Sequence, residues 1–428
     1  VKSPRRRFRP SADIRWMRVS LVVLAACAFA GVAWWAVDRG GLPDPIQVLM
    51  APRAPAGGTG AQVSASSPVA AAVPNGDRDA GLVDVCGLGY VEAKGDTGFV
   101  DPALLAQIPG IEESLRALVE GLRGSPDAFA QAAGTLLEMS GGGDAAQLDQ
   151  LARQATTTDD PRLYALAFRL CGRTPAAGSC ALLSVGQWAR LDEGNGEPWL
   201  FVFDDAAARN DRAQVDEALY RIGNAARFDD RSQTLAGPIV ERAGASASDL
   251  MAAQVLMANA LGFTTALPLP LQRLTNACHG AVLADGNRRQ LCDAVAATLG
   301  ERSDSMLMSM IGATIGQRTG WPMERVIAAR ALSVALSDSR PADTDPATGA
   351  TVSYSCDGVR AELAHLGQLA AVGELQVARD WIAASGKTFD SFARVARDQE
   401  ERRSAAVDDA ARRAASAASA PPAPSQGG

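Results

Sequence analysis

The cysteines are the residues of this chain with the clearest chemistry, because two thiols that meet in an oxidising compartment form a disulfide. The chain has seven, and one of them, Cys27, lies in an apolar N-terminal segment. Of the other six, one pair flanks the short turn GRTPAAGS and a second pair flanks a turn at residues 285–287. These spacings, with elimination for the last pair, predict three disulfides: Cys171–Cys180, Cys278–Cys292 and Cys86–Cys356. Six free, buried thiols are the alternative.

Other residues that could bind a metal are few, and no cofactor is expected. The chain has only two histidines, and one of them, His279, follows Cys278 directly. Adjacent residues of a helix point about 100° apart, so these two side chains do not easily face one zinc ion. Met306, Met308 and Met310 carry thioethers of the kind that bind copper(I). Since only Met306 and Met310 share a helix face, core packing is the favoured interpretation.

Catalytic motifs are missing or incomplete. The chain contains neither a G-x-S-x-G nucleophile elbow nor a Ser-x-x-Lys pair. Residues 386–388 (GKT) match the end of a phosphate-binding loop, but Trp381 stands where the first glycine of that loop belongs, and no predicted strand precedes it. Residues 373–376 (GELQ) resemble part of the lytic transglycosylase pattern, but the catalytic Glu-Ser pair of that family is missing. The acidic residues are scattered, so the sequence favours a protein without catalysis.

An uncharged, apolar run of 19 residues extends from Val19 to Val37. As a helix it would be roughly 28 Å long, close to the hydrocarbon thickness of a bilayer. Residues 1–18 carry seven cations and one anion, a balance of +6, which leaves −13 for the rest of a chain whose net charge is −7. The positive-inside rule therefore predicts a transmembrane signal anchor at 19–37, with residues 1–18 in the cytoplasm and the bulk of the chain outside it.

Two alternatives to this anchor remain open. Residues 24–27 (LAAC) are similar to the lipobox of bacterial lipoproteins, which would make Cys27 a lipid-bearing N-terminus. Residues 28–30 (AFA) have the form of a signal-peptidase site, so cleavage near Ala30 would release the protein. The apolar run continues past both sites, which favours an uncleaved, single-pass anchor in a bacterial inner membrane. All three interpretations place the bulk of the chain in the periplasm.

The composition changes along the rest of the chain. Residues 38–80 are rich in Pro, Ala, Gly and Ser without a helical or alternating period, which predicts a flexible linker. Residues 81–100 are short and irregular or β-like, with a hairpin expected around Gly95-Asp96. Residues 101–400 predict a helical domain. The Ala-rich tail at 401–428 predicts a helix that becomes partly disordered.

The helical prediction for 101–400 depends on start signals and composition. A capping side chain precedes a proline at residues 101–102, 125–126 and 160–161. Aromatic residues make up only 5% of the chain, and Ala fills much of the 47% that is hydrophobic, which favours closely packed helices over strands. Residues 250–271 are uncharged, but their amides and prolines indicate a buried helix and not a second membrane span.

Residues 187–230 resemble a tetratricopeptide (TPR) repeat, which is a pair of antiparallel helices. The matching residues are Leu191, Asp192 and Asn195 in the turn between repeats, Trp199 as the aromatic of the first helix, and Ala218 and Ala225 as the small residues where helices approach closely. Three extra residues between Trp199 and Ala218 depart from the family pattern. Because one repeat cannot bury its own face, the resemblance implies degenerate neighbours. It thus implies an all-α, TPR-like solenoid of antiparallel helix pairs over 101–400, with an irregular helical bundle as the alternative.

These features predict an envelope protein that acts by binding. Helical repeats form extended concave surfaces suited to peptides, so we expect a non-enzymatic scaffold for an envelope protein or peptide that the sequence does not identify. The body of the chain lacks the basic footprint of a nucleic-acid-binding protein. The alternative is an envelope enzyme, such as a peptidoglycan-active hydrolase with an acidic site that no motif reveals.

The predicted topology can be tested with reporters fused after residue 80. Alkaline phosphatase folds only after export, so we expect the phosphatase fusion to be active and a fluorescent reporter that matures only in the cytoplasm to be dark. The opposite pattern would show that the bulk of the chain stays in the cytoplasm.

Overall fold

A computed structural model describes seven stretches of the chain: residues 82–92, 102–139, 145–172, 178–231, 233–265, 269–343 and 352–418. The basic segment 1–18, the predicted anchor 19–37 and the predicted linker 38–80 all lie outside the described residues. Within the seven described stretches, no helix is both long and apolar enough to cross a membrane.

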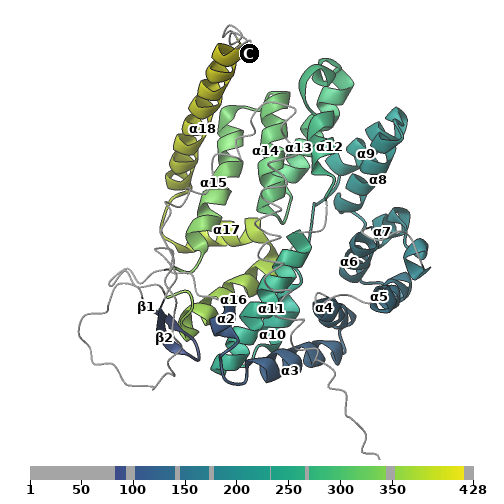
Figure 1. The fold of residues 1–428 in the computed structure, drawn as a ribbon. Helices are drawn as coiled ribbons and strands as arrows, with labels where there is room; N and C mark the ends of the chain where they lie inside the picture. Colours follow the sequence, from purple (N-terminus) through teal and green to yellow (C-terminus); the bar gives the residue numbers. More distant parts are fainter. Residues whose placement is uncertain are drawn as a thin grey trace, which may run out of the picture.

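Helices make up most of the described structure, which confirms the all-α prediction (Figure 1). Those of the first half are α2 (Pro102–Leu105), α3 (Ile111–Arg123), α4 (Ala128–Met139), α5 (Ala145–Thr157), α6 (Pro161–Cys171), the 3₁₀ helix η3 (Gly178–Leu182), α7 (Val185–Leu191), α8 (Glu197–Ala208) and α9 (Arg212–Gly223). Those of the second half are α10 (Ala236–Arg242), α11 (Ala247–Thr265), α12 (Leu271–Ala277), the 3₁₀ helix η4 (Gly280–Ala284), α13 (Gly286–Glu301), α14 (Met306–Thr319), α15 (Met323–Ser339), α16 (Cys356–Val372), α17 (Glu374–Ala384) and α18 (Phe389–Ala418).

A two-stranded hairpin precedes these helices. β1 (Leu82–Val85) and β2 (Gly89–Glu92) pair antiparallel. Gly87 has a φ of 87°, a left-handed conformation that glycine adopts without strain. The structure therefore has a hairpin where the sequence predicts one, but the turn lies at residues 86–88. The predicted turn at Gly95-Asp96 lies outside the described residues. The observed turn contains Cys86, whose disulfide with Cys356 is a long-range contact.

Local capping explains where several helices begin. The predicted start of α6 is correct, because the carboxylate of Asp160 accepts a hydrogen bond from the N–H of Arg162 at 2.8 Å. The start predicted with Ser125 as the cap is displaced by two residues. There, Asp127 caps α4, and its carboxylate accepts two backbone N–H groups. A carboxylate is a stronger acceptor at a helix N-terminus than a neutral hydroxyl, so the charged residue decides the start.

The first hydrophobic core gathers helices from both halves of the chain. α11 packs against α3 and α16, and α10 packs against α16 (Figure 1). The largest side chains of this core include Leu122, Phe129, Tyr164 and Met251. α11, which contains most of the uncharged stretch 250–271, has apolar residues around most of its circumference. Such a helix needs burial on several sides, and here other helices provide it.

The second core supports a row of helices. α8, α9, α13, α14 and α15 pack side by side in that order, and α17 and α18 continue the row through a third, smaller core on α15. Rows of consecutive helix pairs are what a repeat pattern predicts. However, α10 and α11 leave the row between α9 and α13 to join the first core. The helices therefore do not form a strictly linear stack in which each pair touches only its neighbours.

The six cysteines of the described residues pair as the sequence predicts. The Cα–Cα separations are 5.4 Å for Cys171–Cys180, 5.6 Å for Cys278–Cys292 and 4.5 Å for Cys86–Cys356. All three lie below the limit of about 7 Å for an unstrained bridge. Three disulfides in one chain indicate an oxidising compartment.

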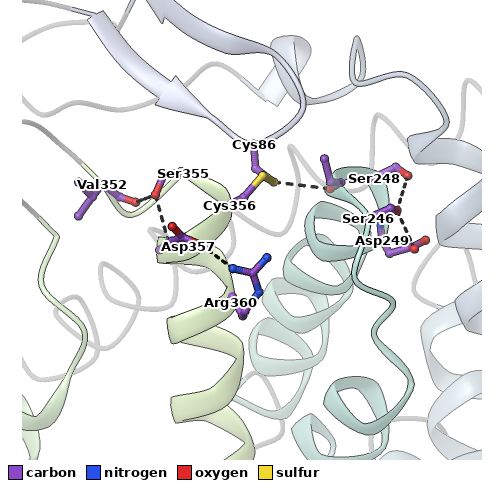
Figure 2. The surroundings of a disulfide bond; sticks show 11 residues. Cys86, Ser246, Ser248, Asp249, Val352, Ser355, Cys356, Asp357 and Arg360 are labelled. Carbon is purple, nitrogen blue, oxygen red and sulfur yellow. Dashed lines mark hydrogen bonds and ion pairs between the residues drawn. A yellow bond between two sulfur atoms is a disulfide. The ribbon is translucent and has the colours of Figure 1, made fainter.

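The Cys86–Cys356 disulfide joins the turn of the hairpin to the first residue of α16 (Figure 2). The backbone N–H of Cys86 also donates to the carbonyl of Tyr354 at 2.8 Å. Next to the bond, the Ser355 hydroxyl caps α16 by accepting the N–H of Gly358 at 3.1 Å. The two cysteines are 270 residues apart, so this bond closes most of the described chain into one covalent loop.

Loop length predicts how much each disulfide stabilises the fold. Replacing Cys86 and Cys356 together by alanine should lower the free energy of unfolding by about 5 kcal/mol, because the unfolded chain regains the entropy of a very long loop. The matched control, Cys171→Ala with Cys180→Ala, opens a loop of 9 residues and should cost about 2.5 kcal/mol. Urea unfolding followed by circular dichroism measures both losses. Equal losses would contradict this ranking.

Candidate functional site

A groove of about 330 Å³ lies where the end of α13, the α14–α15 turn, α15 and α17 meet the start of α18. Its floor and walls are mostly apolar, and its polar lining consists of two arginines and one glutamate. We name it the Trp321 groove, and its lining residues are Gly300, Glu301, Trp321, Arg325, Ala328, Ala329, Leu332, Arg379, Ile382 and Phe389. Phe389 remains 40% exposed, so apolar surface stays open to water.

Close helix packing seats Trp321 in this groove. A Cβ atom at Gly316 would lie 2.3 Å from the Trp321 ring, and one at Gly312 would lie 2.3 Å from the backbone of Gly300. These glycines therefore let α13 and α14 approach and leave room for the indole. The indole Nε1–H donates to the carboxylate of Asp293 at 2.7 Å, which fixes the ring in one orientation.

The polar part of the groove is preorganised and positively charged. The Arg325 guanidinium lies 3.6 Å from the centre of the Trp321 ring, a cation–π contact. Its Nε donates to Glu301 at 2.7 Å, and Arg379 donates to the backbone carbonyl of Glu301 at 3.3 Å. Two guanidiniums thus lie at Glu301, Arg325 on its carboxylate and Arg379 on its backbone carbonyl. Their balance of one positive charge suits an acidic group beside an apolar one.

The repeat residues predicted from the sequence lie elsewhere, around α7, α8 and α9. Their positions are Leu191 at the end of α7, Asp192 at its C-cap, Asn195 before α8, Trp199 on α8, Ala218 on α9 and Ala225 after α9. The structure brings them together on neighbouring elements, but none of them lines the Trp321 groove. The TPR resemblance itself stays a prediction.

Asp192 has a structural role that the resemblance did not imply. Its side chain is fully buried and accepts hydrogen bonds from Arg231 at 2.7 Å, from Asn195 at 2.8 Å and from Arg227. A second buried pair joins Arg169 of α6 to Glu197 of α8. Burial lowers the pKa of Arg169 to about 10, which still leaves it charged at neutral pH. These pairs join the α7–α8 turn to α6 and to the segment before α10.

Two carboxyl groups with raised pKa values mark the place where an acidic catalytic site would be sought. Burial, with Asp230 close by, raises the pKa of Asp304 well above its ordinary value. Burial also raises the pKa of Glu374. Both groups accept backbone N–H groups, Asp304 from Asp230 at 3.0 Å and Glu374 from Met306 at 2.6 Å. Neither lines the Trp321 groove, so their contacts indicate a role in joining loops.

The remaining sequence motifs have structural contacts. Met308 is fully buried whereas Met310 is 40% exposed, so the methionines do not gather around one point. Lys387 forms an ion pair with Asp338 at 2.6 Å, and Thr388 caps α18, so residues 386–388 form a helix start. Among the described residues, no group of three histidine, cysteine or acidic side chains is arranged to hold a metal ion.

Comparisons with protein-family models, with curated proteins and with solved structures find no match to this chain. The groove and the sequence are therefore the features that bear on the function of this chain.

The sequence did not identify the Trp321 groove, although a signal for it exists. Gly312 and Gly316 are four residues apart on one helix, which permits close packing, and a tryptophan follows at 321. Arg325, four residues after the tryptophan, lies in the first turn of α15. The sequence pattern does not indicate that α17 forms part of the groove, because that contact depends on long-range packing.

The acidic loop junction predicts an unusual pH dependence. Asp304→Asn should raise the free energy of unfolding at neutral pH, on the order of 1 kcal/mol, because the native state no longer keeps a carboxylate buried. An asparagine oxygen can still accept the N–H of Asp230. The folded-state pKa of Asp304 lies above 3.8, so the protonated carboxyl group favours the folded wild-type protein in acid. This contribution to the free energy of unfolding is lost as the pH rises through the folded-state pKa. The gain should therefore vanish in acid.

Asp249→Asn is the matched control with the opposite sign. Hydrogen bonds from Ser246 and Ser114 lower the pKa of Asp249, so its contribution is present at neutral pH and is lost as the pH falls. This variant should be less stable than the wild type at neutral pH. Urea unfolding at neutral and acidic pH measures both, and the same pH trend in the two variants would contradict the assignment.

Proposed function

We propose that this protein is a membrane-anchored, non-enzymatic binding protein of the bacterial envelope that holds a short peptide segment in the Trp321 groove. The observation that carries the proposal is the groove itself, where an exposed apolar lining meets a fixed tryptophan and two guanidiniums. Apolar surface left open to water is typical of binding sites. Aromatic and arginine side chains in such a pocket are the residues that contribute most to binding energy at interfaces.

The chemistry of the groove suggests the kind of segment that it binds. Leu332, Ile382 and Phe389 offer apolar contacts to side chains of the ligand. Arg379 and Arg325 offer donors to a carboxylate, and Arg325 is already held in place by Trp321 and Glu301. A side chain fixed before binding loses little entropy on binding. We therefore propose an apolar segment that carries an acidic residue.

The proposed location combines three supports. The disulfides suit the periplasm, residues 19–37 supply the anchor to the inner membrane, and residues 38–80 supply the reach of a linker. The resemblance of residues 187–230 to a tetratricopeptide repeat supports a binding role by analogy of fold, which by itself does not determine function.

Photo-crosslinking in cells tests the proposed function. A photoreactive amino acid at position 389, in the groove, should capture one reproducible partner, and Arg379→Glu should abolish that adduct because it reverses the charge at the rim. Arg153→Glu on α5, a guanidinium whose side chain is 63% exposed, is the matched control and should leave the adduct unchanged.

A second photoreactive position, Tyr220 on α9, is 51% exposed and does not line the groove. The same adducts from positions 220 and 389 would show that capture is nonspecific. Degradation of peptidoglycan by the purified chain would replace the proposal with the enzyme alternative.

A further inference from the structure

The lining of the Trp321 groove is apolar with two guanidiniums and one carboxylate, so the segment that it binds should be apolar with an acidic residue. We propose that residues 44–50 (DPIQVLM) lie in the groove in an extended conformation, with Asp44 at the two arginines, until a partner displaces them. This inference rests on the proposed function, because the segment would regulate the same groove.

The composition of residues 42–50 sets them apart from an ordinary linker. Five of these nine residues have large apolar side chains: Leu42, Ile46, Val48, Leu49 and Met50. Linkers that stay in water are usually built from small, polar and charged residues, and the following residues 51–81 are mostly Ala, Gly, Pro, Ser and charged residues without a large apolar side chain beyond three valines. A cluster of large apolar side chains in such a context needs a surface that covers it.

The order of side chains along the segment complements the lining of the groove. In an extended chain, residues two apart point to the same side, so Asp44, Ile46, Val48 and Met50 share one face. Pro45 favours an extended conformation for itself and for the residue before it. One carboxylate followed by three apolar side chains is what a cationic rim beside an apolar floor would bind.

The length of the intervening chain permits this contact. Thirty-one residues separate Met50 from Leu82, where β1 begins, and they can span about 100 Å when extended. A globular domain of this size is only about 50 Å across. The groove is therefore within reach of the segment along any path over the surface.

The C-terminal tail is a poorer candidate for the same place. α18 has 30 residues and is about 45 Å long, and the groove lies at its first residue, Phe389. Ten residues, 419–428, can span about 35 Å at most, which is less than the length of α18. They also contain no large apolar side chain.

Occupation of the groove by residues 44–50 would also limit how far the helical domain can extend from the membrane. With residues 19–37 as the proposed anchor, docking of residue 44 leaves only about 25 Å of chain between the membrane and the groove. Displacement by a partner frees the whole linker. Partner binding in the groove and extension from the membrane thus become coupled events.

Intramolecular crosslinking in the full-length, detergent-solubilised protein tests the inference. A photoreactive amino acid at position 389 should form an adduct with the proteolytic peptide that contains residues 44–50, identified by mass spectrometry. Changing the inward face (Ile46→Ser, Val48→Ser and Met50→Ser) should lower the yield about tenfold or more. The matched control changes the other face (Gln47→Ser and Leu49→Ser) and should keep most of the adduct.

Charge reversal supplies a second, independent readout. Asp44→Arg should reduce the adduct, and Arg379→Asp in the same chain should restore it, because a rescue of this kind requires that the two residues meet. An equal loss from both faces, or no adduct with residues 44–50 in the wild-type chain, would overturn the inference. If position 389 captures a partner but forms no internal adduct, the inference about residues 44–50 is wrong and the proposed function stands. If it forms the internal adduct but captures no partner, the proposed function is wrong and the inference stands.

Discussion

The buried carboxylate of Asp192 is the constraint on which the arrangement of the two main cores depends. A buried charge has to be paired, and Asp192 obtains its partners from the segment that leads to α10, through Arg227 and Arg231. The neighbouring pair of Arg169 and Glu197 joins α6 to α8 in the same way. Such pairs add little net stability, but removing one partner costs about 3–5 kcal/mol. These ion pairs therefore determine how the row of helices is placed against the first core, and they add little to the free energy of unfolding.

From this junction, a chain of backbone hydrogen bonds leads to the Trp321 groove. The N–H of Phe228 donates to Arg302 at 3.0 Å, and the N–H of Asp304 donates back to Phe228 at 3.1 Å. The N–H of Glu374 then donates to Asp304 at 2.7 Å. Arg302 directly follows α13 and Glu374 begins α17, so the loops that place both walls of the groove are tied to the same polar junction. The raised pKa of Asp304 is the consequence of burying a carboxyl group where three loops meet.

The parts of this structure that the sequence predicts are those with local causes. Asp160 before Pro161 fixes the start of α6 through its own neighbours, and six cysteines allow few sensible pairings once the short turns are recognised. A solenoid of antiparallel helix pairs was expected because one repeat-like segment was extended to the whole domain. The helix content agrees with that expectation, but the row of helices is interrupted at α11, whose apolar circumference requires burial between α3 and α16. The groove escaped prediction because it needs α15 beside α17, and no local pattern encodes that contact.

The covalent loop closed by Cys86–Cys356 has a mechanical consequence. Tension applied between the two ends of the chain would pass through the disulfide and bypass the segment between the two cysteines, which are 270 residues apart. Only the residues before Cys86 and after Cys356 could lengthen under load. Trp321 and Arg325 lie inside the shielded loop, whereas Arg379 and Phe389 lie on the loaded side. A pulling force would therefore separate one wall of the groove from the other, while α13, α14 and α15 keep their fold.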